Sequence, residues 1–408
     1  MKKDYIRKKQ FEELRGKLKN GPRFMQAVIG PRQTGKTTLV LQIMKDWNGP
    51  SLYETADVPG AENKNWIVAL NDMAVNTAKK EKKETLLIID EIQKINGWSD
   101  TLKYIYDKNE REQAKVRIII LGSSSLLMQR GLTESLTGRF EINRNSHWSY
   151  MECRDFFKFS LNDYLYYGGY PGAAKIRRQE KRWNIYIKDS IIETVIAKDV
   201  LFMNPVTKPA LLRQAFALCL HHPAEILSYQ KMLGQLQDAG NTTTIAFYLK
   251  LMANAFFLVP LDKYSGSRIK QKSSSPKLLS LDNSIINVVN NRSYKESLKD
   301  PVYRGRLFEN AVGARLYWLA QEEGWELFYW RERNFEVDYI LSKGSRLIAI
   351  EVKSGYPGKA AAALDIFGSR YKNVEKATIS FKEQKNTTNI KYYTAEEFFL
   401  NPEKLLKR

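Results

Sequence analysis

Residues 30–37, Gly-Pro-Arg-Gln-Thr-Gly-Lys-Thr, constrain the fold more than any other segment of the chain. They match the pattern GxxxxGK[ST], follow the apolar run 25–29 and precede a helical run that begins near Leu39. In such a loop the backbone N–H groups surround phosphate oxygens, and the dipole of the following helix favours negative charge. The segment therefore predicts a nucleotide-binding loop between a buried strand and a helix.

Two side chains of this loop have specific expected roles. Lys36 should reach the β and γ phosphates, and Thr37 should place its hydroxyl on a Mg²⁺ ion. Arg32 would either contact phosphate or brace the loop, and the sequence does not separate these two roles. ATP and Mg²⁺ are the expected cofactors. The residues expected to bind ATP are Gly30, Pro31, Arg32, Gln33, Thr34, Gly35, Lys36, Thr37 and Thr38.

A second apolar run, residues 86–89, ends in the acidic pair Asp90 and Glu91. A pair of acids at a strand end, taken alone, is more often a solvated turn. Downstream of a phosphate-binding loop, the same pattern is typical of a Walker B strand. Asp90 is then expected near the metal, and Glu91 where it orients or deprotonates the attacking water.

Two downstream features add candidate catalytic residues. A third strand-like run, 117–121, leads into a glycine and three serines, of which Ser124 is expected to sense the γ phosphate or hold the water. Arg139 follows a predicted helix end and is a candidate arginine finger for a neighbouring subunit. Such a finger implies a homo-oligomer, whereas a plain surface arginine implies nothing about assembly.

The order of apolar runs divides the chain into four predicted parts. Strand-like and helical runs alternate over residues 24–142, which predicts a parallel sheet flanked by helices. The helical stretch 178–199 then belongs to a lid or linker, and two helices joined by the turn 238–241 belong to a winged helix-turn-helix. The predicted parts are a P-loop ATPase core (1–147), a helical lid or linker (148–207), a winged helix-turn-helix (208–300) and a second α/β domain (301–408).

The last part carries acids in the order that metal-dependent nucleases use. Asp338 precedes Glu351-Val352-Lys353 in a D…ExK pattern, and Glu309 lies on the helix before them. Two carboxylates can hold Mg²⁺ or Mn²⁺ through oxygen, and Lys353 would activate water or stabilise the phosphate. Alternating faces of an ordinary hairpin produce the same pattern without a metal, so cleavage stays an open question.

Strand pairing makes this pattern a structural prediction. With a turn centred near Lys343 and Gly344, Asp338 should pair with Ala349. The period of two then places Glu351 and Lys353 on the same face as Asp338.

The charge balance favours a polyanionic partner. Lys and Arg number 65 against 45 Asp and Glu, a net charge of +20, so nucleic acid is the expected partner, with DNA favoured over RNA. Scattered lysines that merely solvate the surface are the alternative. The run 263–272 would suit a DNA-contacting wing, but the helix beginning at Thr242 carries only Lys250 as a base. The winged helix either contacts DNA or covers the ATPase core.

The remaining composition bounds the class of protein. Two cysteines cannot build a disulfide framework, and the three histidines lack zinc-site spacing. No run approaches the roughly 18 apolar residues of a spanning helix. We expect a cytoplasmic protein without a membrane partner.

Several motifs together resemble a known family, the archaeal-type AAA+ ATPases that carry a C-terminal domain of unassigned function. They are residues 30–37, the segment Ile-Asp-Glu-Ile-Gln-Lys (89–94), Gly-Ser-Ser-Ser-Leu-Leu (122–127), Leu-Thr-Gly-Arg (136–139) and Gly-Gly-Tyr-Pro-Gly (168–172). The resemblance covers nearly the whole chain. It implies an AAA+ core, a winged helix and a restriction-endonuclease-like α/β domain with a PD-(D/E)xK nuclease-like site.

The combined prediction is a Mg²⁺-dependent ATPase coupled to DNA binding or processing. An alternative is a nucleotide-controlled switch or scaffold that acts on a protein partner and keeps a non-cleaving nuclease-like domain. A third is a structure-directed nuclease with a regulatory ATPase.

Overall fold

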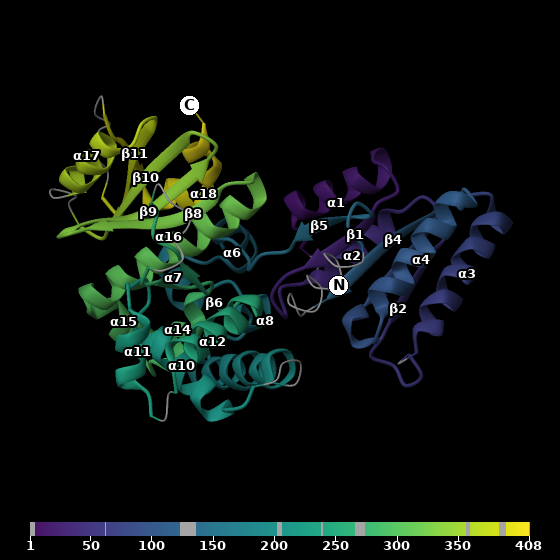
Figure 1. Ribbon diagram of the computed structural model, residues 1–408, viewed down its shortest axis with the longest axis horizontal. Helices are drawn as coiled ribbons and strands as arrows, with labels where there is room; N and C mark the ends of the chain where they lie inside the picture. The colour runs from purple at the N-terminus through teal and green to yellow at the C-terminus, as the bar shows by residue number, and fades with distance from the viewer. Residues whose placement is uncertain are drawn as a thin grey trace. The chain divides into compact units, whose positions relative to one another are not determined.

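The computed structural model describes residues 5–61, 63–122, 136–201, 206–237, 240–265, 274–355, 360–382 and 389–407. The chain divides into two compact units, Met1–Ser146 (unit 1) and His147–Arg408 (unit 2). Both units are drawn in Figure 1. Among the described residues, no helix combines the length and the apolar character needed to cross a membrane.

Unit 1 is built on a parallel sheet. Its strands run in the order β2-β3-β4-β1-β5 and every neighbouring pair is parallel. The strands are β1 (Met25–Ile29), β2 (Ser51–Thr55), β3 (Thr85–Asp90), β4 (Val116–Gly122) and β5 (Phe140–Arg144). The predictions of strands at 25–29, 86–89 and 117–121 are confirmed. This sheet with its flanking helices is a P-loop NTPase fold.

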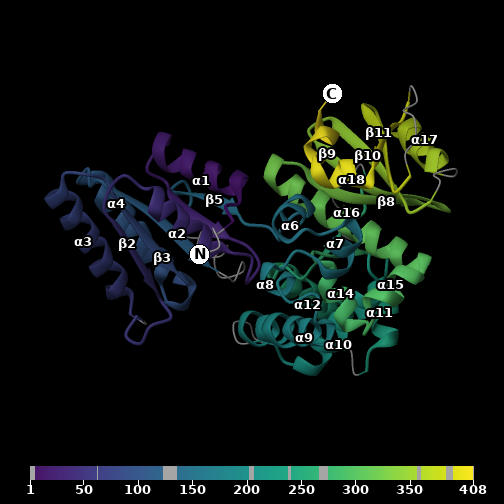
Figure 2. The same cartoon turned by 180° about the vertical axis from the view of Figure 1, so that it is seen from behind.

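Helices cover both faces of this sheet, as the continuous apolar runs of its central strands require. Phe11 of α1 packs with Leu86 and Ile88 of β3, whereas Leu87 and Ile89 pack on the opposite face. Figure 2 shows α1 and α2 on one side of the sheet and α3 and α4 on the other. The helices are α1 (Lys8–Asn20), α2 (Lys36–Asp46), α3 (Lys64–Glu81), α4 (Trp98–Arg111) and the short 3-10 helix η1 (Ile92–Lys94).

Unit 2 begins with a helical region. The predicted helical stretch 178–199 is helical over 180–201, and much of it consists of the π-helices η2 and η3. The helices before residue 202 are α6 (Tyr150–Phe157), α7 (Leu161–Tyr167), α8 (Pro171–Ala174), α9 (Glu180–Ile185), η2 (Tyr186–Glu193) and η3 (Ile196–Leu201).

The segment 208–300, expected to hold two helices and a wing, contains in its described residues three helices before a hairpin and two after it. The prediction of two helices is wrong because the chain leaves helical geometry at His222 and re-enters it after Ser228, whose side chain caps the next helix. Strands β6 (Leu258–Leu261) and β7 (Lys277–Ser280) then pair antiparallel. The helices are α10 (Pro209–His221), α11 (Tyr229–Gln235), α12 (Thr242–Asn254), α14 (Asn283–Val289) and α15 (Tyr294–Lys299).

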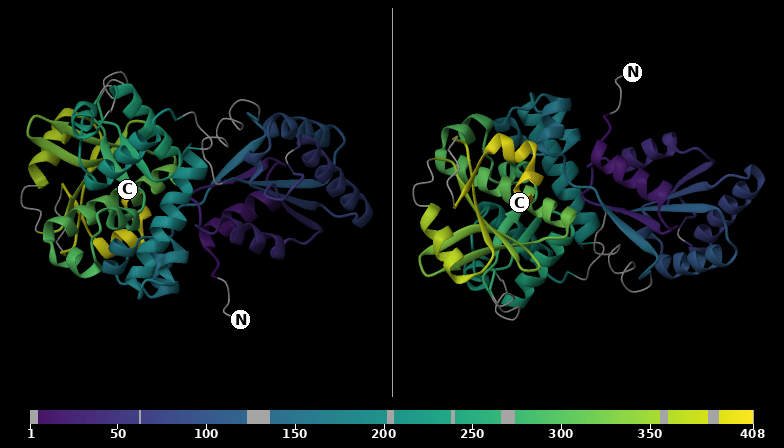
Figure 3. Two further views of the ribbon diagram at one scale, coloured as in Figure 1. Left: turned by 90° about the horizontal axis from the view of Figure 1, so that it is seen from below. Right: turned by 90° about the horizontal axis from the view of Figure 1, so that it is seen from above.

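The end of unit 2 is a mixed sheet in the order β12-β11-β10-β9-β8, coloured green to yellow in the right panel of Figure 3. Helix α16 (Pro301–Glu323) packs on one face, and α17 (Ala360–Arg370) packs on the other. The strands and last helices are β8 (Glu326–Glu332), β9 (Phe335–Lys343), β10 (Arg346–Lys353), β11 (Val374–Ser380), β12 (Lys391–Thr394), α18 (Ala395–Leu400) and η4 (Pro402–Leu406).

Candidate nucleotide site and a buried carboxylate cluster

The glycine-rich loop lies at the carboxyl end of β1, the strand that is flanked in the sheet by the parallel strands β4 and β5. Gly35 precedes α2 with a φ of +94°, a left-handed conformation that favours glycine. Helix α2 begins directly afterwards at Lys36, so its first N–H groups belong to the loop. The loop thus has the anion-binding geometry of a helix N-terminus that follows a buried strand.

The Lys36 ammonium is held against its own loop. Its Nζ donates hydrogen bonds to the carbonyl oxygens of Gly30 at 2.9 Å and Pro31 at 2.7 Å. The Thr34 hydroxyl also donates to the Pro31 carbonyl at 2.9 Å, and it accepts a hydrogen bond from Asn145 Nδ2 at 2.9 Å. The loop is therefore curled around the Lys36 ammonium, which the sequence analysis assigns to the β and γ phosphates.

Asp90 is the point where the loop meets the sheet. Its Oδ2 accepts hydrogen bonds from the hydroxyls of Thr37 at 3.0 Å and Tyr53 at 2.8 Å, and its Oδ1 accepts one from the Glu91 N–H at 2.8 Å. Burial, followed by the hydrogen bond to Asp90, raises the pKa of Tyr53 above its ordinary value. Thr37 and Asp90 are therefore adjacent, as two oxygen ligands of one Mg²⁺ ion must be.

Glu91 adopts an unusual backbone conformation for a non-glycine residue, with a φ of +53°. Left-handed conformations cost such residues about 1–2 kcal/mol, and they gather at functional sites. Gln93 Nε2 donates a hydrogen bond to Glu91 Oε2 at 2.5 Å. The turn after β3 and the Gln93 amide together orient the Glu91 carboxylate beside Asp90.

The other predicted residues of unit 1 are placed as follows. The Arg139 carbonyl accepts a hydrogen bond from the Met25 N–H at 3.0 Å, so Arg139 lies at the end of β1 opposite the loop. Its guanidinium donates to both carboxylate oxygens of Asp107, at 2.8 and 3.1 Å. Arg32 is half-buried, whereas Gln33, Thr37 and Thr38 are exposed. Ser124 lies outside the described residues.

Sequence reasoning missed three contributors to this site. Tyr53 arrives from β2, which pairs with β3, and no local pattern announces that pairing. Asn145 follows β5, bonds Thr34 and accepts a hydrogen bond from the buried Arg7 guanidinium at 3.0 Å. Gln93 lies two residues beyond Glu91 in the segment 89–94, and this short separation was the signal in the sequence that it could contact Glu91.

The acids of the D…ExK pattern do come together in unit 2. Lys353 Nζ lies 2.6 Å from Glu351 Oε2 and 3.9 Å from Asp338 Oδ2. The last ladder pair of β9 and β10 before this point is Tyr339 with Ile350. The Asp338 carboxylate then accepts a hydrogen bond from the Val352 N–H at 2.8 Å, where the two strands part.

The predicted register of this hairpin is wrong by two residues, because the turn is centred one residue later than predicted. Ala349 pairs with Ile340 rather than Asp338 because the tight turn contains Gly344 and Ser345, with Lys343 opposite Arg346. Gly344 has a φ of +59°, and this left-handed geometry centres the turn one residue later than expected.

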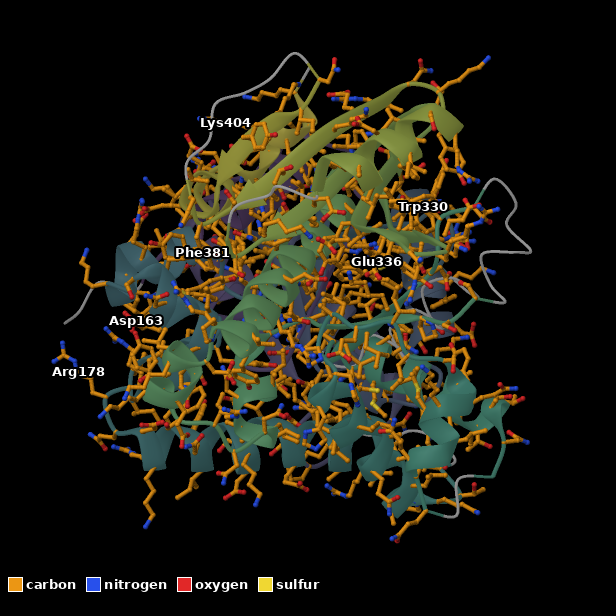
Figure 4. All side chains as sticks on the ribbon, turned by 90° about the vertical axis from the view of Figure 1, so that its left-hand side faces the viewer. Asp163, Arg178, Trp330, Glu336, Phe381 and Lys404 are labelled. Atoms are coloured by element: carbon orange, nitrogen blue, oxygen red, sulfur yellow. The ribbon has the colours of Figure 1, made fainter. Side chains whose placement is uncertain are left out.

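A lysine that the sequence analysis did not select completes the cluster. Lys277, at the start of β7, has a fully buried side chain. Its Nζ lies 2.7 Å from Glu309 Oε1, 3.3 Å from Glu336 Oε1 and 3.6 Å from Asp338 Oδ1. In Figure 4, Glu336 lies between the C-terminal sheet above and the helices below. We call Lys277, Glu309, Glu336, Asp338, Glu351 and Lys353 the carboxylate cluster.

Burial and the neighbouring charges together set the pKa values in this cluster. Burial raises the pKa of Glu309 to about 7 and that of Glu351 to about 9, and the Asp338 carboxylate raises both as well. Burial by itself lowers the pKa of Lys277, but the carboxylates of Glu309 and Asp338 outweigh it and raise that pKa well above its ordinary value. Lys277 therefore stays a cation.

Models of known protein families match three segments of the chain, one in the first unit and two in the second. Residues 23–153 match a family model described as an AAA domain. Residues 158–296 and 304–396 match two models that are each described as a domain of unknown function (DUF8612 and DUF4143). The AAA-domain match of residues 23–153 agrees with the P-loop NTPase fold of unit 1.

One relative and two solved structures are similar to parts of this chain. An uncharacterized protein of Methanocaldococcus jannaschii, MJ1544, is 23% identical over 344 residues, which cover 78% of this chain and 72% of that protein. The Walker-type ATPase PABY2304 of Pyrococcus abyssi has a TM-score of 0.52 at 14% identity, and the match covers 70% of this chain and 96% of that one. The RuvB Holliday junction branch migration motor of Thermotoga maritima reaches a TM-score of only 0.35 at 13% identity, over 62% of this chain and 90% of that one. These likenesses concern the fold.

Proposed function

We propose that this chain is a Mg²⁺-dependent ATPase whose site is the edge of the unit 1 sheet at the ends of β1 and β3. The observation that carries the proposal is the 3.0 Å hydrogen bond between Thr37 and Asp90, which joins the phosphate loop to the acidic strand end. The AAA-domain match of residues 23–153 supports the same reading.

Each side chain of the site has a role in this proposal. The loop N–H groups bind the phosphates, and the Lys36 ammonium exchanges its carbonyl partners for β and γ phosphate oxygens. Thr37 and Asp90 hold Mg²⁺, which neutralises phosphate charge when it is bound. Glu91 accepts a proton from the water whose oxygen attacks the γ phosphorus, and the bond to the bridging oxygen breaks as ADP leaves.

Arg139 would act on a neighbouring subunit's ATP rather than on its own. Consecutive strand residues rise by about 3.3 Å, so a residue at the far end of β1 lies more than about 10 Å from the loop. The proposal therefore includes a homo-oligomer in which the Arg139 guanidinium leaves Asp107 for phosphate. Ser124 remains a proposed sensor of the γ phosphate.

Nucleic acid is the proposed coupled partner, and DNA is favoured. The net charge of +20 supports it. Exposed basic side chains such as Arg178, which projects outward in Figure 4, add to the positive electrostatic field of the protein. The alternative partner is a protein whose binding is switched by nucleotide occupancy.

The first experiment is the steady-state ATPase rate of the purified chain at moderate salt, with and without double-stranded DNA. Glu91→Gln serves as the matched blank, because it should still bind ATP and lose turnover by about 100-fold or more. Stimulation by DNA that is absent from the blank supports coupling. ATP binding with no turnover above the blank contradicts the ATPase proposal and favours the switch.

A mixing experiment tests Arg139. Arg139→Ala and Glu91→Gln should each be inactive alone, and their mixture should recover part of the activity. In mixed oligomers an intact Glu91 site meets an intact arginine from its neighbour. A mixture as inactive as its components would remove Arg139 from the site.

A further inference from the structure

Lys277 is the most unusual charged group in the described part of the chain. It is a fully buried lysine in the middle of acids from different elements, namely α16 and β9. Its Nζ also lies 5.0 Å from the centre of the Tyr339 ring, within cation–π range. A buried ammonium persists only when opposite charges compensate it, so this geometry requires the acids to face Lys277.

Several carboxylate oxygens of the cluster face a donor, whereas Glu351 Oε1 is buried without a hydrogen-bond partner. Glu309 and Asp338 Oδ1 face Lys277, at 2.7 and 3.6 Å. Asp338 Oδ2 accepts the Val352 N–H, and Glu351 Oε2 faces Lys353. Among the residues that the structure describes, no three His, Cys, Asp or Glu side chains converge so that they could hold a metal ion. The side-chain ligands left to a metal at the D…ExK pattern are therefore two carboxylates, Asp338 and Glu351, and the Lys277 ammonium lies 3.6 Å from Asp338.

We propose that the Lys277 ammonium is the resident cation of the carboxylate cluster and excludes a divalent cation from it. A metal bound through Asp338 Oδ1 would lie about 2–2.6 Å from that oxygen. The Lys277 ammonium lies 3.6 Å from the same oxygen and 2.7 Å from Glu309 Oε1, and two cations that close repel strongly in a buried site. Because Lys277 is part of the chain, its ammonium occupies this position without having to bind from solution, as a metal ion would.

Two consequences follow for unit 2. The cluster joins β7 of the middle segment to α16 and to β9 of the final sheet, so it acts as an ionic tie inside the unit. Metal-dependent cleavage of nucleic acid at Asp338 and Glu351 is not expected, because the cation that such chemistry needs has no place there.

Direct counting of bound Mn²⁺ tests the proposal. Free Mn²⁺ is measured by electron paramagnetic resonance during titration of the nucleotide-free full chain and of Asp338→Asn. Both proteins contain the same phosphate loop, so any difference reports on the cluster. The expected result is the same number of bound ions in both. One further ion in the unsubstituted chain that Asp338→Asn loses would overturn the proposal.

Removal of the lysine gives a positive test. Lys277→Met keeps a long side chain without the charge, and it should gain one Mn²⁺ site that the double variant with Asp338→Asn lacks. Lys353→Met is the matched control, because it removes the half-exposed lysine of the cluster and should gain none. A folded Lys277→Met that binds no additional Mn²⁺ would contradict the proposal. If Lys277→Met does not fold, the Asp338→Asn comparison still decides. None of these readouts involves ATP, so they stand apart from the proposed ATPase.

Discussion

At the scale of single residues, hydrogen bonds hold the Asp90 carboxylate in a fixed orientation. Three donors from β2, α2 and its own neighbour fix the orientation of its two oxygens. Groups that orient a metal ligand in this way affect metal affinity although they never touch the ion. In the proposed Mg²⁺ site, Tyr53 is such a positioning residue, and its role can be tested by mutation.

Tyr53→Phe should raise the Mg²⁺ concentration needed for half-maximal ATP turnover by about 10-fold, because Asp90 loses an orienting hydrogen bond. Saturating Mg²⁺ should restore most of the rate. The measurement is a Mg²⁺ titration of ATPase activity at fixed ATP. Tyr104→Phe is the control, because Tyr104 is exposed on α4. A loss of rate that no Mg²⁺ concentration recovers would argue against a positioning role.

Asp282 carries a second prediction at this scale. Burial raises its pKa to about 6 from an ordinary 3.8, although the Gly169 and Ser284 N–H groups oppose the rise. The folded state therefore binds the proton more tightly than the unfolded state. The stabilisation is complete below the unfolded pKa and is lost as the pH rises through about 6.

The comparison of wild type with Asp282→Asn isolates this effect, because other titrating groups cancel. The wild-type free energy of unfolding minus that of the variant should fall between about pH 4 and pH 6.5, by at most about 3 kcal/mol. Urea unfolding at several pH values measures it. A difference that rises with pH would contradict the raised pKa.

At the scale of elements, the glycine-rich segment after α7 has a structural role outside the nucleotide site. Gly168 ends α7 with a φ of +68°, and a Cβ atom there would lie 2.0 Å from Asp282 Oδ1. The neighbouring Gly169 N–H donates to the same carboxylate at 2.6 Å. The segment is therefore a close-contact joint between α7 and the start of α14.

Gly168→Ala should destabilise the protein by about 2–4 kcal/mol, because a side chain must displace a buried carboxylate and adopt a strained φ. Gly234→Ala is the matched control, since Gly234 lies on α11 with open space around its Cβ position. The control should be neutral or stabilising by up to about 1 kcal/mol. Chemical unfolding of both variants decides, and equal effects would refute the contact argument.

At the scale of the whole molecule, the two units have separate hydrophobic cores, so ligand binding should stabilise them unequally. Heating the full chain should give two transitions, of which ATP with Mg²⁺ raises only one. Binding at 100 times Kd stabilises a folded unit by about 2.7 kcal/mol. Differential scanning calorimetry with and without ATP measures this. Lys36→Ala should abolish the rise, and a rise that survives the substitution would place ATP elsewhere.

The amino-acid sequence by itself determined the phosphate loop, the acidic strand end and the strands of the parallel sheet. These features depend on local patterns: glycine spacing, a buried apolar run and the alternation of strand and helix. It also brought Asp338, Glu351 and Lys353 together, because they lie on two strands of one hairpin, although the turn centre was misplaced by one residue.

Only the tertiary structure decided which distant groups join these sites. Tyr53 meets Asp90 because β2 pairs with β3, and Lys277 enters the carboxylate cluster because β7 packs beside α16. Such contacts depend on strand order and helix packing, which follow from burying the whole apolar surface at once and leave no mark in any short segment. The D…ExK pattern therefore does not predict the buried Lys277 ammonium, which we propose takes the place of the metal that the pattern suggests.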